Sequence, residues 1–89
     1  MSEINHPTGR QLAAARTLTG LGQAELAALA NISAPTLRRM EASDGPLTGM
    51  ANNIAAVVRV LYDHGVIFLD GPYSGDGGPG VRLRSADRT

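Results

Sequence analysis

Residues 23–41 read Gln23-Ala24-Glu25-Leu26-Ala27-Ala28-Leu29-Ala30-Asn31-Ile32-Ser33-Ala34-Pro35-Thr36-Leu37-Arg38-Arg39-Met40-Glu41, and this stretch decides the fold. Its first part consists of strong helix formers, and Asn31 can end a helix because asparagine tolerates a left-handed backbone. Ser33 can cap a second helix, and Pro35 is tolerated in a first turn, where its missing N–H is not needed. The stretch therefore predicts two short helices joined by a tight turn.

The second of these helices is expected to run from Ala34 to about Ala42. Leu37 and Met40, three residues apart, form its apolar side, and most of its other positions face outward. Two helices joined in this way form a helix-turn-helix, in which the second helix enters the major groove of DNA while the first braces it across the backbone. We therefore interpret residues 33–41 as a recognition helix.

Helical spacing of apolar residues also indicates a helix on either side of this pair. The earlier helix begins at the cap Thr8 and ends at Gly20. The later one runs from about Gly49 to His64, with Gly65 placed as its C-cap. This last helix carries more apolar side chains than one small core requires, which suggests a partner chain.

After Gly65 the pattern changes from helix to strand. Residues 66–69 form a short apolar run and residues 81–84 alternate, with glycine- and proline-rich sequence between them. The expected fold is mainly α, with a four-helix domain over residues 8–65 followed by a C-terminal β-hairpin over residues 66–84. Residues 1–7 are expected to form a flexible arm and residues 85–89 a flexible tail.

Composition sets limits on the function. The chain has 89 residues, enough for one domain, and its basic and acidic residues are equal in number, so its formal net charge is zero. It has no cysteine, and His6 and His64 are far apart, so we expect no disulfide, metal site or cofactor. No nucleophile with a matching base or paired carboxylates is visible, and we do not expect an enzyme. No membrane span or signal peptide is recognisable, which predicts a cytoplasmic protein.

The stretch 23–41 resembles the helix-turn-helix of the phage-repressor and Cro-like family of transcriptional regulators, often called XRE. In that family a Gln opens the supporting helix, an Ala lies midway, a small turn residue precedes an apolar residue and a Ser, and the recognition helix ends in an apolar residue followed by Glu. All of these elements are present. The chain departs from the family at Gly22, usually Ser or Thr, at Asn31, usually Gly, and at Ala34, often Arg or Gln. The resemblance covers about residues 10–64 and implies a lambda repressor-like fold.

The resemblance also implies how DNA would be bound. Gln23 and the N–H groups at the start of the supporting helix would hold a phosphate. Arg39 would read a base edge, and Arg38 would contact a phosphate. The start of the recognition helix would face the bases, through Ser33, Ala34, Pro35 and Thr36. The methyl groups of Ala34 and Thr36 suit contact with thymine. Arg16 and Glu41 match a family pair that links the first helix to the end of the recognition helix, so a structural salt bridge is expected.

Regulators of this class read paired half-sites about 34 Å apart, so a homodimer on double-stranded DNA carrying an inverted-repeat operator is expected. Two strands alone are marginal in water, which favours the hairpin as the dimer contact. The predicted interface residues are Val66, Ile67, Phe68, Leu69, Val81 and Leu83. The sequence Gly80-Val81-Arg82-Leu83-Arg84 and the apolar strand before it also resemble the C-terminal extension of a subgroup of bacterial regulators of this family. The overall expectation is a transcriptional regulator, specifically a repressor.

Other interpretations stay open. The same fold could bind a protein, as an antitoxin or an anti-activator does, and the neutral charge and the uncharged helix tip Ala34-Pro35 favour this reading. Arg38 and Arg39 could also be a solvated helix face in a protein whose two helices meet at a turn by chance. The glycine-rich residues 75–80 are expected to be a loop rather than a phosphate site, because a strand and not a helix follows.

Overall fold

The computed structural model describes residues 7–43, 51–69 and 78–84. In this part of the chain a mainly helical body is followed by an antiparallel β-hairpin, which confirms the expected fold class at that level. In chain order the elements are α1 (Gly9–Thr19), α2 (Gln23–Ala30), α3 (Ala34–Glu41), α4 (Ala51–Asp63), β1 (Val66–Leu69) and β2 (Gly80–Leu83). The start predicted for the fourth helix, Gly49, lies outside the described residues.

Helix α1 begins and ends as its sequence predicts. The Thr8 hydroxyl accepts a hydrogen bond from the Gln11 N–H at 3.0 Å, and the Gln11 side chain accepts one from the Thr8 N–H at 2.8 Å. This reciprocal pair satisfies two N–H groups that a helix start otherwise leaves without partners. Gly20 ends the helix with a φ of 84°, a left-handed conformation that glycine adopts without strain. Pro7, predicted as part of a flexible arm, is instead buried directly before the cap.

The turn between α2 and α3 consists of Asn31, Ile32 and Ser33. Asn31 ends α2 with a φ of 61°. Among the residues that the structure describes, it is the one non-glycine residue with a positive φ. Ser33 caps α3 by accepting a hydrogen bond from the Thr36 N–H at 3.2 Å. Ile32 is half-buried against the core. The turn is therefore held at both ends by the residues that the sequence assigned to it.

One apolar core joins all four helices to β1. The largest of its side chains that are wholly buried are Leu12, Leu26, Leu37, Leu61, Val57 and Val66. Every helix contributes at least one of them, so no helix can leave without exposing apolar surface to water. This shared core fixes the position of α3 relative to the rest of the helical body.

The hairpin pairs Val66 with Leu83 and Leu69 with Gly80. Gly65 leads into it from α4 with a φ of 94°, and its carbonyl accepts a hydrogen bond from the Arg84 N–H at 2.7 Å. The second strand begins one residue earlier than the alternation of Val81-Arg82-Leu83-Arg84 predicts. A glycine at position 80 has no side chain and so contributes no signal to an alternating pattern, although its backbone pairs normally.

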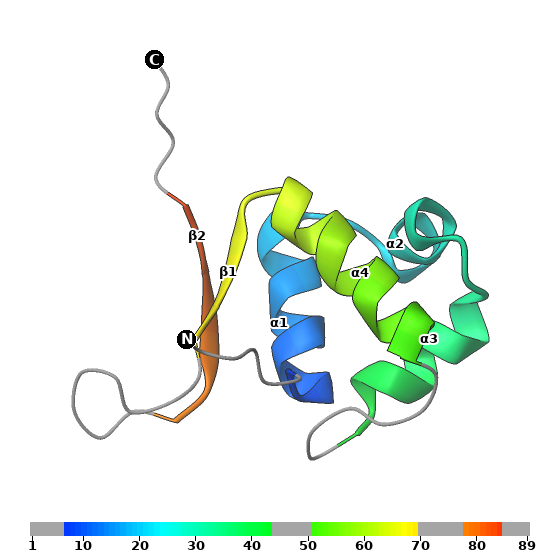
Figure 1. The fold of residues 1–89 in the computed structure, drawn as a ribbon, viewed down its shortest axis with the longest axis horizontal. Coiled ribbons are helices and arrows are strands. Elements are labelled where there is room, and N and C mark those ends of the chain that lie inside the picture. The colour runs from blue at the N-terminus through cyan, green and yellow to red at the C-terminus, as the bar shows by residue number, and fades with distance from the viewer. Residues whose placement is uncertain (1–6, 44–50, 70–77, 85–89) are drawn as a thin grey trace.

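Figure 1 shows how these elements are arranged. Helix α1 lies between the hairpin on one side and α3 on the other, and α4 runs diagonally across the helical body next to α2. The hairpin therefore packs on α1 and α4 rather than on α3. Among the residues that the structure describes, no helix is long and apolar enough to cross a membrane.

Candidate nucleic-acid interface

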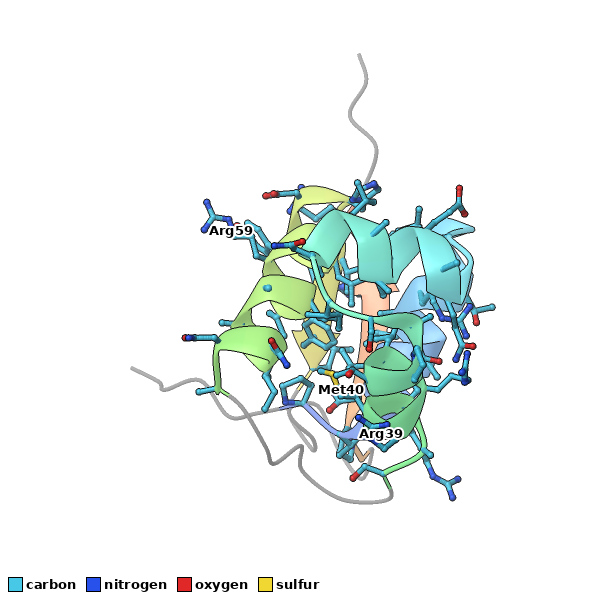
Figure 2. The ribbon with its side chains drawn as sticks, turned by 90° about the vertical axis from the view of Figure 1, so that its right-hand side faces the viewer. Arg39, Met40 and Arg59 are labelled. Atoms are coloured by element: carbon cyan, nitrogen blue, oxygen red, sulfur yellow. The ribbon has the colours of Figure 1, made fainter. Side chains whose placement is uncertain are left out.

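The outer side of α3 is defined by which of its residues are buried. Successive residues of an α-helix are turned by about 100°. Leu37 is wholly buried and Met40 is 9% exposed, and both face the core. Pro35 and Arg39 then lie about 160–200° from Leu37 around the helix axis, and both are exposed. Figure 2 shows Met40 directed inward and Arg39 on the outside of the same helix.

A chain of hydrogen bonds connects three side chains on this helix. The Ser33 hydroxyl donates to the Thr36 hydroxyl at 2.8 Å, and Arg39 Nη2 donates to the same Thr36 oxygen at 3.4 Å. The three residues are spaced by three, so they lie on one stripe of the helix. Thr36 is half-buried, while Ser33 and Arg39 are exposed. The Arg39 guanidinium is thereby directed back toward the start of α3.

One predicted base contact, Ala34, is placed differently by the structure. The Ala34 methyl packs against the core, so less of it faces outward than the sequence suggests. Pro35 is exposed and lies on the outer side. Arg38 is exposed on the flank of α3, about 100° from Leu37. The groups that α3 presents outward are therefore the Pro35 ring, the guanidinium groups of Arg38 and Arg39, and the Thr36 hydroxyl.

The Glu41 carboxylate joins three helices at the end of α3. Its Oε2 accepts a hydrogen bond from Arg16 Nε at 2.7 Å, and its Oε1 accepts one from Arg16 Nη2 at 3.0 Å and one from Gln23 Nε2 at 2.9 Å. The Glu41 side chain is 6% exposed. Arg16 lies on α1 and Gln23 on α2, so one buried carboxylate fixes α3 against both. The expected ion pair between Arg16 and Glu41 is present.

The Arg16 guanidinium has a second task. Its Nη1 donates to the Leu21 carbonyl at 3.2 Å, which ties the loop between α1 and α2 to the same cluster. The hydrogen bond that Arg16 donates to Glu41 raises the pKa of Arg16 above its ordinary value, partial burial opposes this, and the Glu41 charge adds to the rise. Arg16 therefore stays charged at every pH at which the protein is handled.

The start of α2, where a phosphate is expected to bind, already holds an acid. The Glu25 carboxylate accepts a hydrogen bond from the Gly22 N–H at 2.8 Å. An anion at a helix start is favourable because the N–H groups there carry partial positive charge. Gln23 lies beside it, with its amide nitrogen bonded to Glu41. Any phosphate at this end of α2 would approach a carboxylate, which the sequence-based prediction did not consider.

Gly9 is a residue whose importance the sequence did not indicate. A side chain at this position would collide with the backbone oxygens of Met40 and Ser43, at the end of α3. The start of α1 and the end of α3 are therefore packed backbone against backbone, a distance that only glycine permits. A glycine inside the first turn of a helix is the signal that could have drawn attention to it.

Gln11 was also missed. Its side chain is 7% exposed, and its amide nitrogen donates to the carbonyls of Leu69 and Gly80, at 3.0 Å and 2.9 Å. These two residues face each other at the loop end of the hairpin. Gln11 therefore attaches the hairpin to α1 through backbone atoms. The available signal was its place three residues after Thr8, where a capping box requires Gln or Glu.

The six residues predicted to form a dimer interface divide between two faces of the hairpin. Val66 is wholly buried in the chain's own core, which corrects its assignment to an interface. Phe68 and Val81 are opposite each other in the register and pack against the same core. Ile67 and Leu69 alternate with the inward residues and so belong to the outer face. Leu83 lies opposite Val66 in the register and so belongs to the inward face, although it is 42% exposed.

Among the described residues, no group of three His, Cys, Asp or Glu side chains could hold a metal ion. Neither protein-family models nor curated proteins give a match to the sequence.

Proposed function

We propose that this chain is a sequence-specific DNA-binding transcriptional regulator, a repressor, built on a lambda repressor-like helix-turn-helix. In this proposal α3 lies in the major groove, and α2 crosses the backbone. The observation that carries the proposal is the division of α3 into an anchored side and a free side. Leu37, Met40 and Glu41 hold the helix, while Arg38 and Arg39 project from it. A short helix exposed in this way and fixed from behind is what groove recognition requires.

The rigidity of the support is the second argument. Base recognition needs donor groups held in register with base edges, and the phosphate contacts supply that register. Gln23, the proposed phosphate ligand, is bonded to the same Glu41 carboxylate that fixes the end of α3. The phosphate-binding and base-reading residues are therefore linked through one buried group, which favours their use on a single ligand.

A homodimer is part of the proposal. A chain with zero net charge gains little from the DNA backbone, so one copy binds weakly and two copies bind an inverted repeat far better. The outer hairpin face, defined here as Ile67 and Leu69, is proposed as the contact between copies, with Tyr62 at its margin. Tyr62 is 59% exposed, and its ring lies 5.1 Å from the Arg84 guanidinium.

Arginine substitutions test this function with a matched control. Duplexes are first selected by the wild-type protein from a random pool, and binding is then compared for Arg39→Ala and Arg59→Ala. Arg59 is exposed on α4 and projects away from α3, so both variants lose one exposed positive charge. Arg39→Ala is expected to weaken cognate binding by about 1–3 kcal/mol and to relax one base preference, while Arg59→Ala has little effect. Equal losses for the two variants, or equal losses on cognate and random DNA, would refute base reading by Arg39.

A second candidate function is recognition of a protein, by an antitoxin or an anti-activator. The observation that favours it is the outer side of α2, where Leu29 is 54% exposed next to the exposed Ala28. Exposed apolar side chains gathered on one side of a surface helix are typical of a contact with another protein. Leu29→Asp separates the two functions, because it would abolish binding to a protein partner while leaving DNA selection by α3 unchanged.

A further inference from the structure

The hydrogen bonds along α3 point to a role for Thr36 that is exerted through Arg39. We propose that Thr36 is a positioning residue, whose hydroxyl holds the Arg39 guanidinium over the first turn of α3, where it reads a guanine. This inference rests on the proposed function, since it specifies which base the recognition helix reads and how. It replaces the thymine contact that the Thr36 methyl was expected to make.

The bond to Thr36 changes the position of the Arg39 guanidinium along α3. Arg39 belongs to the last turn of α3, whereas recognition helices read bases chiefly with their first residues. The bond from Arg39 Nη2 to Thr36 Oγ1 directs the guanidinium back by three residues, about 4.5 Å of helix rise. Helical side chains generally point toward the N-terminus, which favours this direction. The tether thus brings a late arginine to the end of the helix that reads bases.

The Thr36 oxygen is held in place by its own hydrogen bonds. It accepts one hydrogen bond from Ser33 Oγ and one from Arg39, which occupies both of its acceptor sites. Ser33 Oγ is itself fixed, because as the helix cap it accepts from the Thr36 N–H. The arginine is therefore held by a hydroxyl that is tied to the backbone of α3. Because its oxygen already accepts two hydrogen bonds, Thr36 is poorly suited to accept one from the amino group of adenine or cytosine.

The geometry of the Arg39 donors favours guanine as the base that is read. A guanidinium has several N–H donors in one plane, and its two-pronged match on a base edge is the O6 and N7 pair of guanine. An arginine without a tether turns easily to the nearest phosphate, which binds every sequence alike. The Thr36 tether opposes that movement and leaves the other guanidinium donors directed outward. Guanine is therefore the base that this arrangement selects.

The experiment uses the full chain and a duplex selected by the wild-type protein. Each guanine of one half-site is replaced in turn by 7-deazaguanine, which lacks the N7 acceptor, and binding is measured for wild type, Thr36→Val, Thr36→Ser and Arg39→Ala. We expect one position at which the replacement weakens wild-type binding about tenfold. Thr36→Ser keeps the hydroxyl and should keep this sensitivity. Thr36→Val keeps the shape and should lose most of it, as Arg39→Ala does.

The double variant Thr36→Val/Arg39→Ala distinguishes positioning from direct contact. If Thr36 acts through Arg39, adding Thr36→Val to Arg39→Ala changes the affinity by less than about twofold. A full additional loss in the double variant, or wild-type sensitivity to 7-deazaguanine in Thr36→Val, would overturn the inference. A selected half-site without a sensitive guanine would overturn it too. Failure to select any sequence would instead contradict the proposed function. Unfolding by urea, measured on each variant, shows that the fold is kept.

Discussion

Two carboxylates, those of Glu41 and Glu25, affect how α3 is held in the fold and how the start of α2 would receive an anion. The Glu41 carboxylate takes three hydrogen bonds from two helices, and it is almost wholly buried. The Glu25 carboxylate takes one from the Gly22 N–H at the exposed start of α2. The first group stabilises the fold that presents α3, while the second lies where the proposed phosphate must bind. Disturbing the Glu41 cluster should therefore lower stability, whereas removing the Glu25 charge should strengthen DNA binding.

Removing the partner of Glu41 should destabilise the protein. Arg16→Met leaves a buried carboxylate with Gln23 as its remaining side-chain partner, and we expect the free energy of unfolding to fall by about 3 kcal/mol. Urea unfolding followed by circular dichroism measures this. The double variant Arg16→Met/Glu41→Leu removes both charges and should regain much of the loss. If the double variant is less stable than the single one, the ion pair is not the cause.

Glu25→Gln should strengthen DNA binding. Glutamine still offers an oxygen to the Gly22 N–H, yet it carries no charge to repel a phosphate at the start of α2. We expect affinity for any duplex to rise about two- to fivefold at low salt. Asp63→Asn, at an exposed acid at the end of α4, is the control for the change in net charge. A gain no larger than that of the control means that no phosphate binds at this helix start.

At the scale of elements, the helix boundaries could be predicted because their signals are local. Thr8, Gly20, Asn31 and Ser33 act within a turn of themselves, through their own side chains or backbone freedom. The contacts of Gly9 and Gln11 could not be predicted, because their partners are distant in the sequence and are backbone atoms, which carry no residue signature. Residues 66–69 are all apolar, so the sequence could not tell which of them face the core.

The hairpin gives the prediction for assembly. Ile67→Glu puts a charge on the outer hairpin face, and we expect it to shift the oligomer from dimer to monomer at micromolar concentration, as measured by light scattering. Ala28→Glu, on the exposed side of α2 away from the hairpin, is the control. Deleting the hairpin would be a poorer test, because Val66 belongs to the core and its loss would unfold the chain. A dimer that survives Ile67→Glu with its fold intact would place the contact elsewhere.

At the scale of the whole molecule, charge and geometry have to be considered together. A formal charge of zero means that specificity cannot rest on general attraction to the DNA backbone. In the proposed function, specificity comes from a few well-held groups on α3 and from two copies acting at once. The fold is arranged accordingly, with the outer side of α3 and the hairpin separated by α1 (Figure 1). The DNA and the second copy of the proposed function would therefore occupy different surfaces.

Whether α3 reads DNA is decided by selecting bound sequences from a random duplex pool with the whole 89-residue chain. We predict enrichment of an inverted repeat whose half-site centres are about 34 Å apart, about one helical turn, with a guanine in each half-site. The same selection with Arg39→Ala should lose that guanine. A pool that shows no enriched sequence after repeated rounds would contradict the claim and favour a protein as the ligand.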